Sequence, residues 1–328
     1  MPDGPGCDPA GAGRTLVVEA PARLDAVVHA ACGLSRRLVH RLIADGAVRV
    51  NGRRAAKGDR VLPGDRVTLP AAAALAPEPE LGLAVLHEDA GIAAVEKPGG
   101  MPSHALDPRE RGTAAAFVLA RWPETAAVGD PLAPGLVHRL DTGTSGILLV
   151  ARTPALFSVV RAAFAARRVE KHYLALVHGR PPARTTVRSP LAHDPADRRR
   201  MRPARPGERA WAAETRLETL SAGGGVALVA ATIRTGVTHQ VRAHLAALGC
   251  PVLGDRIYGG PDACLPASRH ALHASAILLE AAGLPGLALE SPLPADLAAL
   301  SVHAGGAPPS CVRDGEPAAS ARQQPHGR

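Results

Sequence analysis

The stretch from His138 to Gly146 constrains the fold of this chain more than any other segment. Its residues are His-Arg-Leu-Asp-Thr-Gly-Thr-Ser-Gly, and it leads directly into the apolar run Ile147–Val150. Glycine, serine and aspartate favour a turn, whereas a short apolar run favours a buried strand. We therefore expect Asp141 to lie at the edge of a sheet, where the backbone fixes its carboxylate. Ordinary turn chemistry is the alternative explanation for an aspartate at this position.

The segments on either side of this turn predict a mixture of strands and helices. Residues 83–97 alternate in polarity and predict a hairpin. Apolar residues recur at helical spacing in Thr153–Arg168, which predicts an amphipathic helix. The next run, Glu170–Val177, alternates again and predicts a strand with Lys171 and Tyr173 on one face.

A further helix is expected to begin at Thr238. Its predicted buried face comprises Val241, Leu245 and Leu248. His239 and Arg242 are three residues apart, so their side chains share one face of this helix. No carboxylate or thiol stands at ligand spacing near the histidines of this region, so we expect no metal site.

These motifs, in this order, resemble those of the RluA/RluD-type pseudouridine synthases. His138–Asp141, with the Thr-Ser-Gly that follows, resembles the catalytic signature of the family. Lys97–Gly100 resembles the "Lys-Pro-x-Gly" turn that precedes it, and Thr235–His244 resembles a third signature. The chain departs from that third signature at Val237, where the family usually has arginine. The resemblance extends over about residues 20–303.

The resemblance implies an isomerase that converts uridine in RNA to pseudouridine and needs no cofactor. It implies that Asp141 is the catalytic carboxylate and that Arg139, Tyr173 and Arg242 support it. Tyr173 is expected to stack on the base and Arg242 to pair with the carboxylate, keeping it ionised. The implied fold class is α+β, with a catalytic domain built on a mixed, mainly antiparallel β-sheet flanked by helices.

Basic residues outnumber acidic ones between Arg23 and Arg66. A helix between Ser35 and Gly46 would place cations on one face and apolar residues on the other, and Asn51-Gly52 predicts a tight hairpin. This small N-terminal helix-helix-hairpin module resembles the alpha-L (ribosomal-protein-four-like) RNA-binding fold. Its candidate RNA contacts are Arg36, Arg37, Arg41, Arg53 and Arg54.

The overall charge also favours a polyanionic partner. Lys and Arg number 38 against 30 Asp and Glu, which gives a formal net charge of +8. The arginine-rich segment Asp197–Arg205 is a candidate clamp on an RNA backbone, with Arg198, Arg199 and Arg200 as its proposed contacts. A solvated charge run is the alternative explanation.

Low-complexity stretches divide the chain. We expect disordered tails at residues 1–14 and 304–328, an alpha-L RNA-binding domain at 15–69, an Ala/Pro linker at 70–82 and the catalytic domain at 83–303. The 5 cysteines are widely spaced, and no long apolar span or signal-peptide pattern occurs. We therefore expect a cytoplasmic monomer without a membrane segment.

The expected substrate is uridine in large-subunit ribosomal RNA, because an attached alpha-L module resembles that branch of the family. The same chemistry on tRNA is one alternative, and a non-catalytic RNA-binding or ribosome-assembly factor is another. A sugar hydrolase would need two facing carboxylates, whereas Asp141 is the one compelling carboxylate in the sequence.

Overall fold

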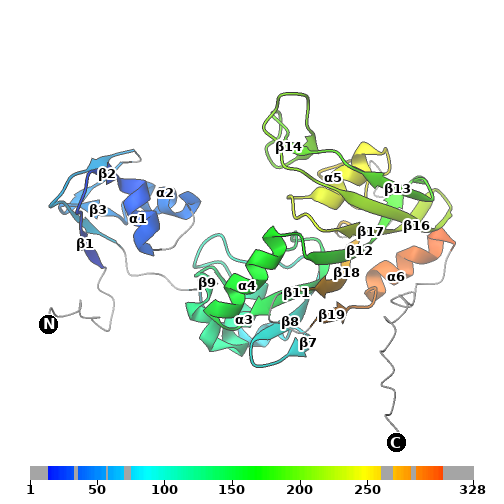
Figure 1. The fold of residues 1–328 in the computed structure, drawn as a ribbon, viewed down its shortest axis with the longest axis horizontal. Coiled ribbons are helices and arrows are strands. Elements are labelled where there is room, and N and C mark those ends of the chain that lie inside the picture. The colour runs from blue at the N-terminus through cyan, green and yellow to red at the C-terminus, as the bar shows by residue number, and fades with distance from the viewer. Residues whose placement is uncertain are drawn as a thin grey trace, which may run out of the picture.

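The computed structural model describes residues 14–32, 36–56, 58–69, 75–259, 269–281 and 286–305, without the side chain of Arg37. Two units of α+β structure follow one another along the chain, a small N-terminal one and a larger one built on a long sheet (Figure 1). The expected terminal tails lie almost entirely outside the described residues, as does the start of the expected linker.

The N-terminal unit places two helices against short antiparallel strands. Its sheet has the strand order β1-β6-β3-β4, and β2 pairs separately with β5. Buried valines from both helices and from the sheet form its core, among them Val28, Val39 and Val67. Its elements are β1 (Thr15–Val17), β2 (Ala22–Arg23), α1 (Leu24–Cys32), α2 (Arg36–Ala44), β3 (Arg49–Val50), β4 (Arg53–Arg54), β5 (Arg60–Val61) and β6 (Arg66–Thr68).

Two left-handed turns shape this unit as the sequence predicts. Gly46 follows α2 with φ 74°, and the hairpin between β3 and β4 turns at Asn51 and Gly52 with φ 49° and 77°. Glycine and asparagine adopt this conformation at low cost, so both turns form where their residues occur. Ser35, the residue expected just before this helix, lies outside the described residues.

The larger unit is built on one nine-stranded sheet with the order β13-β16-β17-β12-β18-β11-β8-β7, and β19 pairs with β18. Neighbouring strands are antiparallel except for β11 and β18, which are parallel. The sheet strands are β7 (Val85–Glu88), β8 (Ile92–Lys97), β11 (Ser145–Ala151), β12 (Val169–His178), β13 (Arg184–Val187), β16 (Thr215–Gly223), β17 (Val226–Ile233), β18 (Leu272–Leu279) and β19 (Leu287–Glu290). This is the mixed, mainly antiparallel sheet that we expected.

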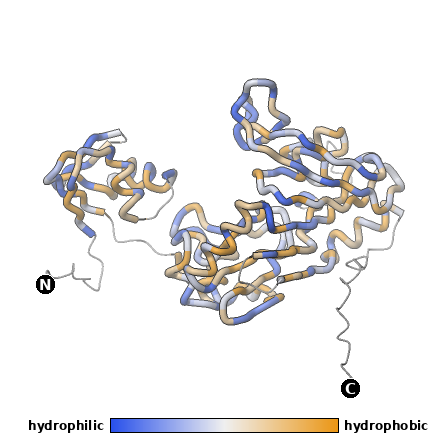
Figure 2. The backbone as a smooth tube through the Cα atoms, in the orientation of Figure 1, coloured by the Kyte–Doolittle hydropathy of each residue, from blue (hydrophilic) through white to orange (hydrophobic). Residues whose placement is uncertain are grey.

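Helices and short strands surround the sheet. They are η1 (Pro79–Leu81), α3 (Ala114–Arg121), η2 (Pro123–Ala127), β9 (Gly129–Asp130), β10 (Ala133–Pro134), α4 (Pro154–Ala165), β14 (Leu191–His193), β15 (Met201–Pro203), α5 (Gln240–Ala247), α6 (Ala295–Ser301) and η3 (Val302–Ala304). Hydrophobic residues follow the central strands and the helices that cover them (Figure 2).

The two faces of the sheet pack against different helices. On one face, Ile147 and Leu149 of β11 contact Val160 of α4 in one cluster. On the other face, Leu148 of β11 belongs to a larger cluster that includes Phe117 of α3. Alternate residues of a strand point to opposite faces, so a strand buried on both sides must be apolar throughout. This explains the uninterrupted apolar run after Asp141.

Three sequence-based expectations need correction. The helix expected from Thr238 begins at Gln240, and Leu248 is 38% exposed because the helix has already ended there. The arginine-rich segment is not a loop throughout: Arg198, Arg199 and Arg200 lie in the loop of a β-hairpin, and the residues that follow form β15, which pairs with β14. Residues 75–82 of the expected linker pack on α3, where the backbone N–H of Glu78 donates to Ala116.

Candidate active site

Asp141 lies in the turn between β10 and β11, and the surrounding backbone holds that turn closed. The Thr144 N–H donates to the Asp141 carbonyl at 3.0 Å, and the Gly100 N–H donates to the Thr142 carbonyl at 2.8 Å. The buried ammonium of Lys97 donates to the same Thr142 carbonyl at 3.1 Å. The carboxylate of Asp141 therefore projects from a rigid turn, with its side chain 20% exposed.

Arg242 of α5 reaches the same carboxylate. Its Nη1 lies 2.7 Å from Oδ2 of Asp141. Its Nε and Nη2 donate to the two carboxylate oxygens of Asp255 at 2.7 and 2.8 Å. The side chain of Arg242 is 4% exposed and that of Asp255 is fully buried. A bidentate carboxylate fixes the plane of a guanidinium, so Asp255 orients the Arg242 guanidinium with Nη1 toward Asp141.

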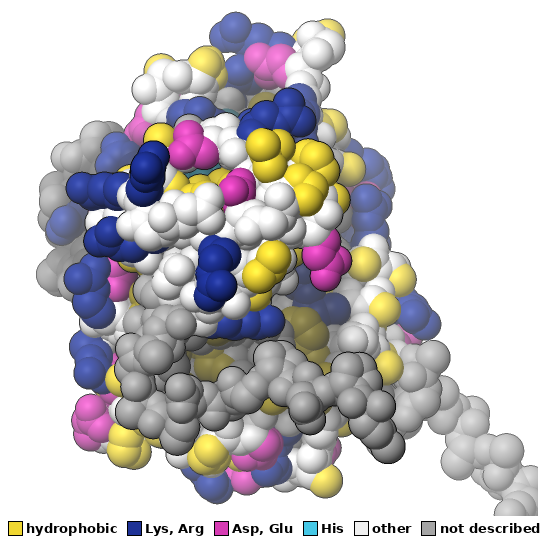
Figure 3. Space-filling model, turned by 90° about the vertical axis from the view of Figure 1, so that its left-hand side faces the viewer, with side chains coloured by type: hydrophobic (Ala, Val, Ile, Leu, Met, Phe, Trp, Pro, Cys, Tyr) yellow, Lys and Arg dark blue, Asp and Glu magenta, His cyan; other side chains and the backbone are white. Residues whose placement is uncertain are grey.

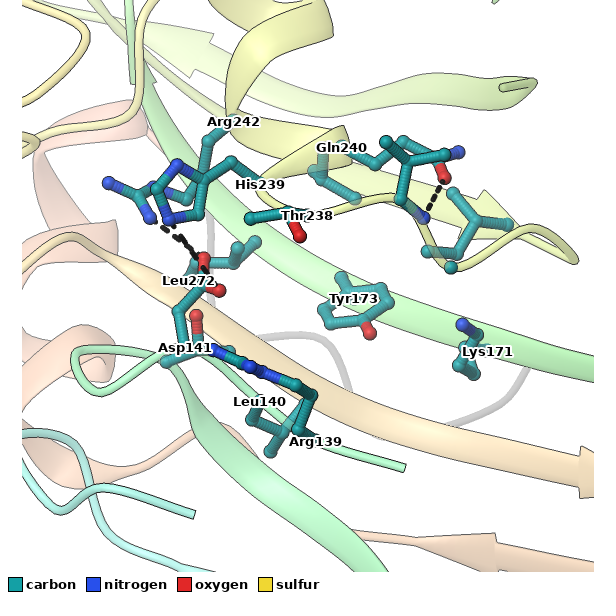
Figure 4. Close-up of a pocket in the computed structure, with 15 residues that line it drawn as sticks. Arg139, Leu140, Asp141, Lys171, Tyr173, Thr238, His239, Gln240, Arg242 and Leu272 are labelled. Atoms are coloured by element: carbon teal, nitrogen blue, oxygen red, sulfur yellow. Dashed lines mark hydrogen bonds and ion pairs between the residues drawn. The ribbon is translucent and has the colours of Figure 1, made fainter. Parts of the chain in front are cut away.

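His239 approaches the other oxygen of Asp141, with Nε2 3.8 Å from Oδ1. It occupies the position before α5 in a left-handed conformation, φ 56°, which turns its ring toward the carboxylate. In Figure 4, His239 and Arg242 approach the Asp141 carboxylate from the same side. Both side chains approach the carboxylate, but His239 precedes α5, so the two residues do not share a face of that helix as expected.

These neighbours keep Asp141 ionised. Burial alone pushes the pKa of this carboxyl upward, but His239 and Arg242 outweigh it, so the pKa lies below its usual value. Burial also lowers the pKa of Arg242, yet Asp255 and Asp141 raise it further, and the guanidinium stays charged. The site thus holds a carboxylate anion in a largely buried place.

Tyr173 and Lys171 stand on β12 and line the same cavity, whose volume is about 100 Å³ (Figure 4). The ring of Tyr173 is 8% exposed, and burial, followed by the charge of Asp141, raises the pKa of its hydroxyl. The ammonium of Lys171 donates to the Thr235 carbonyl at 2.8 Å, and burial lowers its pKa to about 8. A flat ring and a cation therefore line the same small cavity as Asp141.

Two residues of the site were not found from the sequence. One is Asp255, whose role depends on Arg242. The other is Tyr258, whose ring lies 5.2 Å from the Arg242 guanidinium and whose hydroxyl accepts from the Met201 N–H at 2.8 Å. Its hydroxyl also lies 3.1 Å from Nδ1 of His239. The scarcity of tyrosine, 2 in the whole chain, was the available signal for Tyr258.

The arginines proposed to support the site or bind RNA differ in how freely they face solvent. Arg139 lines the cavity and is exposed, and its guanidinium makes no hydrogen bond with any described residue. Arg198 is exposed, Arg199 pairs with Asp197 at 2.8 Å, and Arg200 packs 5.6 Å from the Tyr258 ring centre. The segment therefore offers fewer free cations than its sequence suggests.

The cations of the N-terminal unit differ in the same way. Arg36 and Arg53 are exposed, whereas Arg54 donates to the Ala44 carbonyl at 3.0 Å. Arg41 pairs with Asp107 of the larger unit at 3.1 Å. The side chain of Arg37 lies outside the described residues. Viewed from the end that carries this unit, Lys and Arg side chains gather along one side (Figure 3).

Among the described residues, no group of His, Cys, Asp or Glu is arranged to hold a metal ion. No helix in the described part of the chain is long and apolar enough to cross a membrane. The candidate site comprises the Asp141 carboxylate, the Arg242 guanidinium and the His239 ring beside it, the buried Tyr173 ring and a basic rim.

Comparison with known proteins places this chain in a family. The pattern described as RNA pseudouridylate synthase matches residues 91–247, and that of the S4 domain matches residues 22–67. An uncharacterized RNA pseudouridine synthase of Chloroflexus aurantiacus is 40% identical over 269 residues, covering 80% of this chain and 84% of that protein. The solved structure of human RNA pseudouridylate synthase domain containing 1 has 26% identity and a TM-score of 0.54, covering 68% of this chain and 85% of that one.

A further relative is the ribosomal large subunit pseudouridine synthase D of Nitrosomonas europaea, which is 37% identical over 227 residues and covers 66% of this chain and 64% of that protein. The chain belongs to the RNA pseudouridine synthases of the RluA/RluD type, with an S4 RNA-binding domain at its N-terminal end. Members of this family are isomerases that act on RNA, as the motifs around Asp141 predict.

Proposed function

We propose that this protein isomerises specific uridines of large-subunit ribosomal RNA to pseudouridine, with Asp141 as the catalytic carboxylate. One observation carries the proposal. Asp141 is held ionised by Arg242 at 2.7 Å, in a small cavity that it shares with the ring of Tyr173. A single ionised carboxylate facing an aromatic ring suits a reaction that detaches and rebinds a base.

The reaction breaks the glycosidic N–C bond, rotates the uracil and rejoins it to the ribose through carbon. The reaction needs the charge of Asp141 whether the carboxylate attacks the sugar, attacks the base or moves a proton at the sugar. Arg242 and His239 hold that charge in place. Tyr173 offers a flat surface on which the uracil rests while it is detached.

The remaining cations position the RNA. The target uridine must leave its stack to reach Asp141, so the enzyme has to bind the RNA backbone on either side of it. Exposed arginines at the rim, such as Arg139 and Arg198, are suited to contact phosphates. We assign further RNA binding to residues 15–69 and the chemistry to residues 83–303, in a protein that acts as a monomer.

Large-subunit ribosomal RNA is the proposed target because a relative with 37% identity carries that substrate in its name. Pseudouridines should be mapped in ribosomal RNA and tRNA of a deletion strain and of the same strain complemented with the wild-type gene or with Asp141→Asn. Sites in large-subunit ribosomal RNA should disappear on deletion and return only with the wild-type gene. Loss confined to tRNA would overturn the proposed target and keep the proposed chemistry.

A further inference from the structure

A second cleft adjoins the catalytic cavity, and the reaction itself does not use it. It has a volume of about 510 Å³ and lies between the end of α4 and the β14–β15 hairpin. We call it the side cleft. Its lining includes Phe164, Arg167, His193, Trp211 and Arg234. The segment Gly236–Thr238 lines both the side cleft and the catalytic cavity. A chain that enters one can therefore continue into the other.

Trp211 is the main aromatic surface of the side cleft. Its side chain is 43% exposed, and no described residue accepts a hydrogen bond from its indole N–H. Its backbone is fixed, because Leu191 and Trp211 exchange two N–H···O bonds of 2.9 Å. The ring of His193 lies 5.4 Å from the indole ring, at an interplanar angle of 86°, so it does not stack flat on the indole. A rigid, exposed ring of this kind suits stacking.

Charge in the side cleft favours an anion. No Asp or Glu occurs among the described residues that line it, whereas Arg167 and Arg234 do. The guanidinium of Arg167 makes no hydrogen bond or ion pair with any described residue. Arg234 uses its Nε on Glu170 at 2.8 Å, so its remaining N–H groups stay available. Positive charge beside an exposed ring is the combination that binds single-stranded nucleic acid.

The backbone at Arg167 adds a second observation. Arg167 follows α4 with φ 58°, a left-handed conformation that glycine adopts at the least cost. Its N–H donates to Phe164 at 3.1 Å, and that of Arg168 donates to Ala163 at 2.9 Å, which closes the helix. The chain thus places a long cationic side chain at a position whose backbone conformation favours glycine.

We propose that the side cleft binds the base of a nucleotide adjacent to the target uridine, stacked on Trp211, with Arg167 on the phosphate between them. This rests on the proposed function, because it takes the uridine to lie beside Asp141. The path across Gly236–Thr238 is shared by both cavities, so adjacent nucleotides of one strand can fill them together. Val237 lies on this path and lines both cavities.

Tryptophan fluorescence provides a direct test. The chain has 2 tryptophans, and the other, Trp122, is 1% exposed and donates to Glu88 at 3.0 Å. The trinucleotide UpUpU should quench the fluorescence of Asp141→Asn protein at concentrations about tenfold below those needed for UMP. Trp211→Phe should abolish this quenching. Equal quenching by UMP and UpUpU, or quenching that persists in Trp211→Phe, would overturn the proposal.

Steady-state kinetics provide the second readout. On a ribosomal RNA stem-loop, Trp211→Ala should raise KM about tenfold with kcat nearly unchanged, whereas Trp211→Phe should stay within about threefold. Leu220→Ala, at another exposed apolar residue, is the matched control and should change neither. When the nucleotide whose base would stack on Trp211 is made abasic, the KM of the wild-type enzyme should also rise about tenfold. On this abasic RNA, Trp211→Ala should cause no further increase in KM.

The two proposals fail separately. If the wild-type enzyme forms pseudouridine, but Trp211→Ala leaves KM unchanged and UpUpU does not quench, the side-cleft proposal is wrong and the proposed function stands. If UpUpU quenches selectively but no RNA is converted to pseudouridine, the proposed chemistry is wrong and the binding site stands.

Discussion

At the scale of single residues, the site depends on a buried arginine shared by two carboxylates. Asp255 and Arg242 are both almost fully buried, and removing Asp255 leaves Nε and Nη2 of Arg242 without their acceptors. We predict that Asp255→Ala lowers the free energy of unfolding by about 3–5 kcal/mol. It should also lower kcat more than it raises KM, since it misorients Arg242 beside Asp141.

A matched control exists in the same unit. Arg269 and Asp296 form a similar bidentate pair, at 2.9 and 3.1 Å, but Asp296 is 54% exposed. Asp296→Ala should therefore cost less than about 1 kcal/mol. Urea unfolding of both variants measures the difference. Equal losses in the two variants would show that Asp255 has no special positioning role.

A second prediction at this scale concerns pH. Burial lowers the pKa of Lys171 to about 8 from its ordinary value of 10.5. Between these values the unfolded state binds more protons than the folded state, so stability conferred through this residue rises with pH. The free energy of unfolding of wild-type protein, relative to Lys171→Met, should increase by about 1–2 kcal/mol between pH 8 and pH 10.

RNA affinity should fall as the pH rises over the same range, because the cavity loses a positive charge as Lys171 deprotonates. Lys171→Arg should remove this loss, since arginine stays charged. Urea melts and binding isotherms at each pH test both statements. A flat difference in unfolding free energy would contradict the assigned environment of Lys171.

At the scale of elements, the β14–β15 hairpin is joined to the active site through Tyr258. The hydroxyl of Tyr258 accepts from the Met201 N–H and contacts His239, so it links the hairpin to the residue that faces Asp141. We predict that Tyr258→Phe costs about 1–3 kcal/mol, because it leaves the buried Met201 N–H without its acceptor.

Hydrogen exchange checks this prediction, since the Met201 amide should lose protection while amides of β12 keep theirs. Tyr173→Phe is the control for stability, because no described residue bonds to the Tyr173 hydroxyl. Unchanged protection at Met201 in Tyr258→Phe would show that the hairpin is held by other contacts.

The elements also show what a sequence can and cannot predict here. Strand β12 and helix α4 follow from local alternation and helical periodicity, and both were located within a few residues. The pairing of Arg242 with Asp141 followed only from the family resemblance. Asp255 was given no role, because the fold of the turn after α5 brings it to Arg242, and the sequence alone does not show that contact.

The arginine-rich segment illustrates the opposite error. Its charges suggested a clamp on an RNA backbone, but part of it is β15, which pairs with β14. Arg202 forms a bidentate pair with Glu208 at 2.7 and 2.8 Å, and Arg200 packs on Tyr258. Sequence composition counts charges, whereas tertiary structure determines which of them remain free.

At the scale of the whole molecule, the S4 domain stands apart from the catalytic sheet in Figure 1. Arg41 and Asp107 form a partly exposed ion pair, which contributes little to stability. Leu38 of α2 also belongs to the same buried cluster as Leu83 of the larger unit. We predict that deleting residues 1–70 leaves a cooperative melt of the catalytic unit. The truncated protein should bind RNA more weakly and with a shallower dependence on salt, because it loses phosphate contacts.

The double variant Arg36→Gln with Arg53→Gln is the control that keeps the domain in place. Both arginines are exposed. If each contacts a phosphate, the slope of log affinity against log salt should fall by about 1.4–1.8. An insoluble or non-cooperative truncation would show that the N-terminal unit is needed for folding.

The measurement that tests the central claim most directly is pseudouridine formation by Asp141→Asn on ribosomal RNA, beside its binding isotherm and thermal melt. Asparagine keeps the volume of the side chain and removes the charge that Arg242 and His239 hold. We predict a folded protein that binds RNA nearly as well as the wild type and forms no detectable pseudouridine. Turnover near the wild-type rate, with deamidation excluded by mass spectrometry, would contradict Asp141 as the catalytic carboxylate.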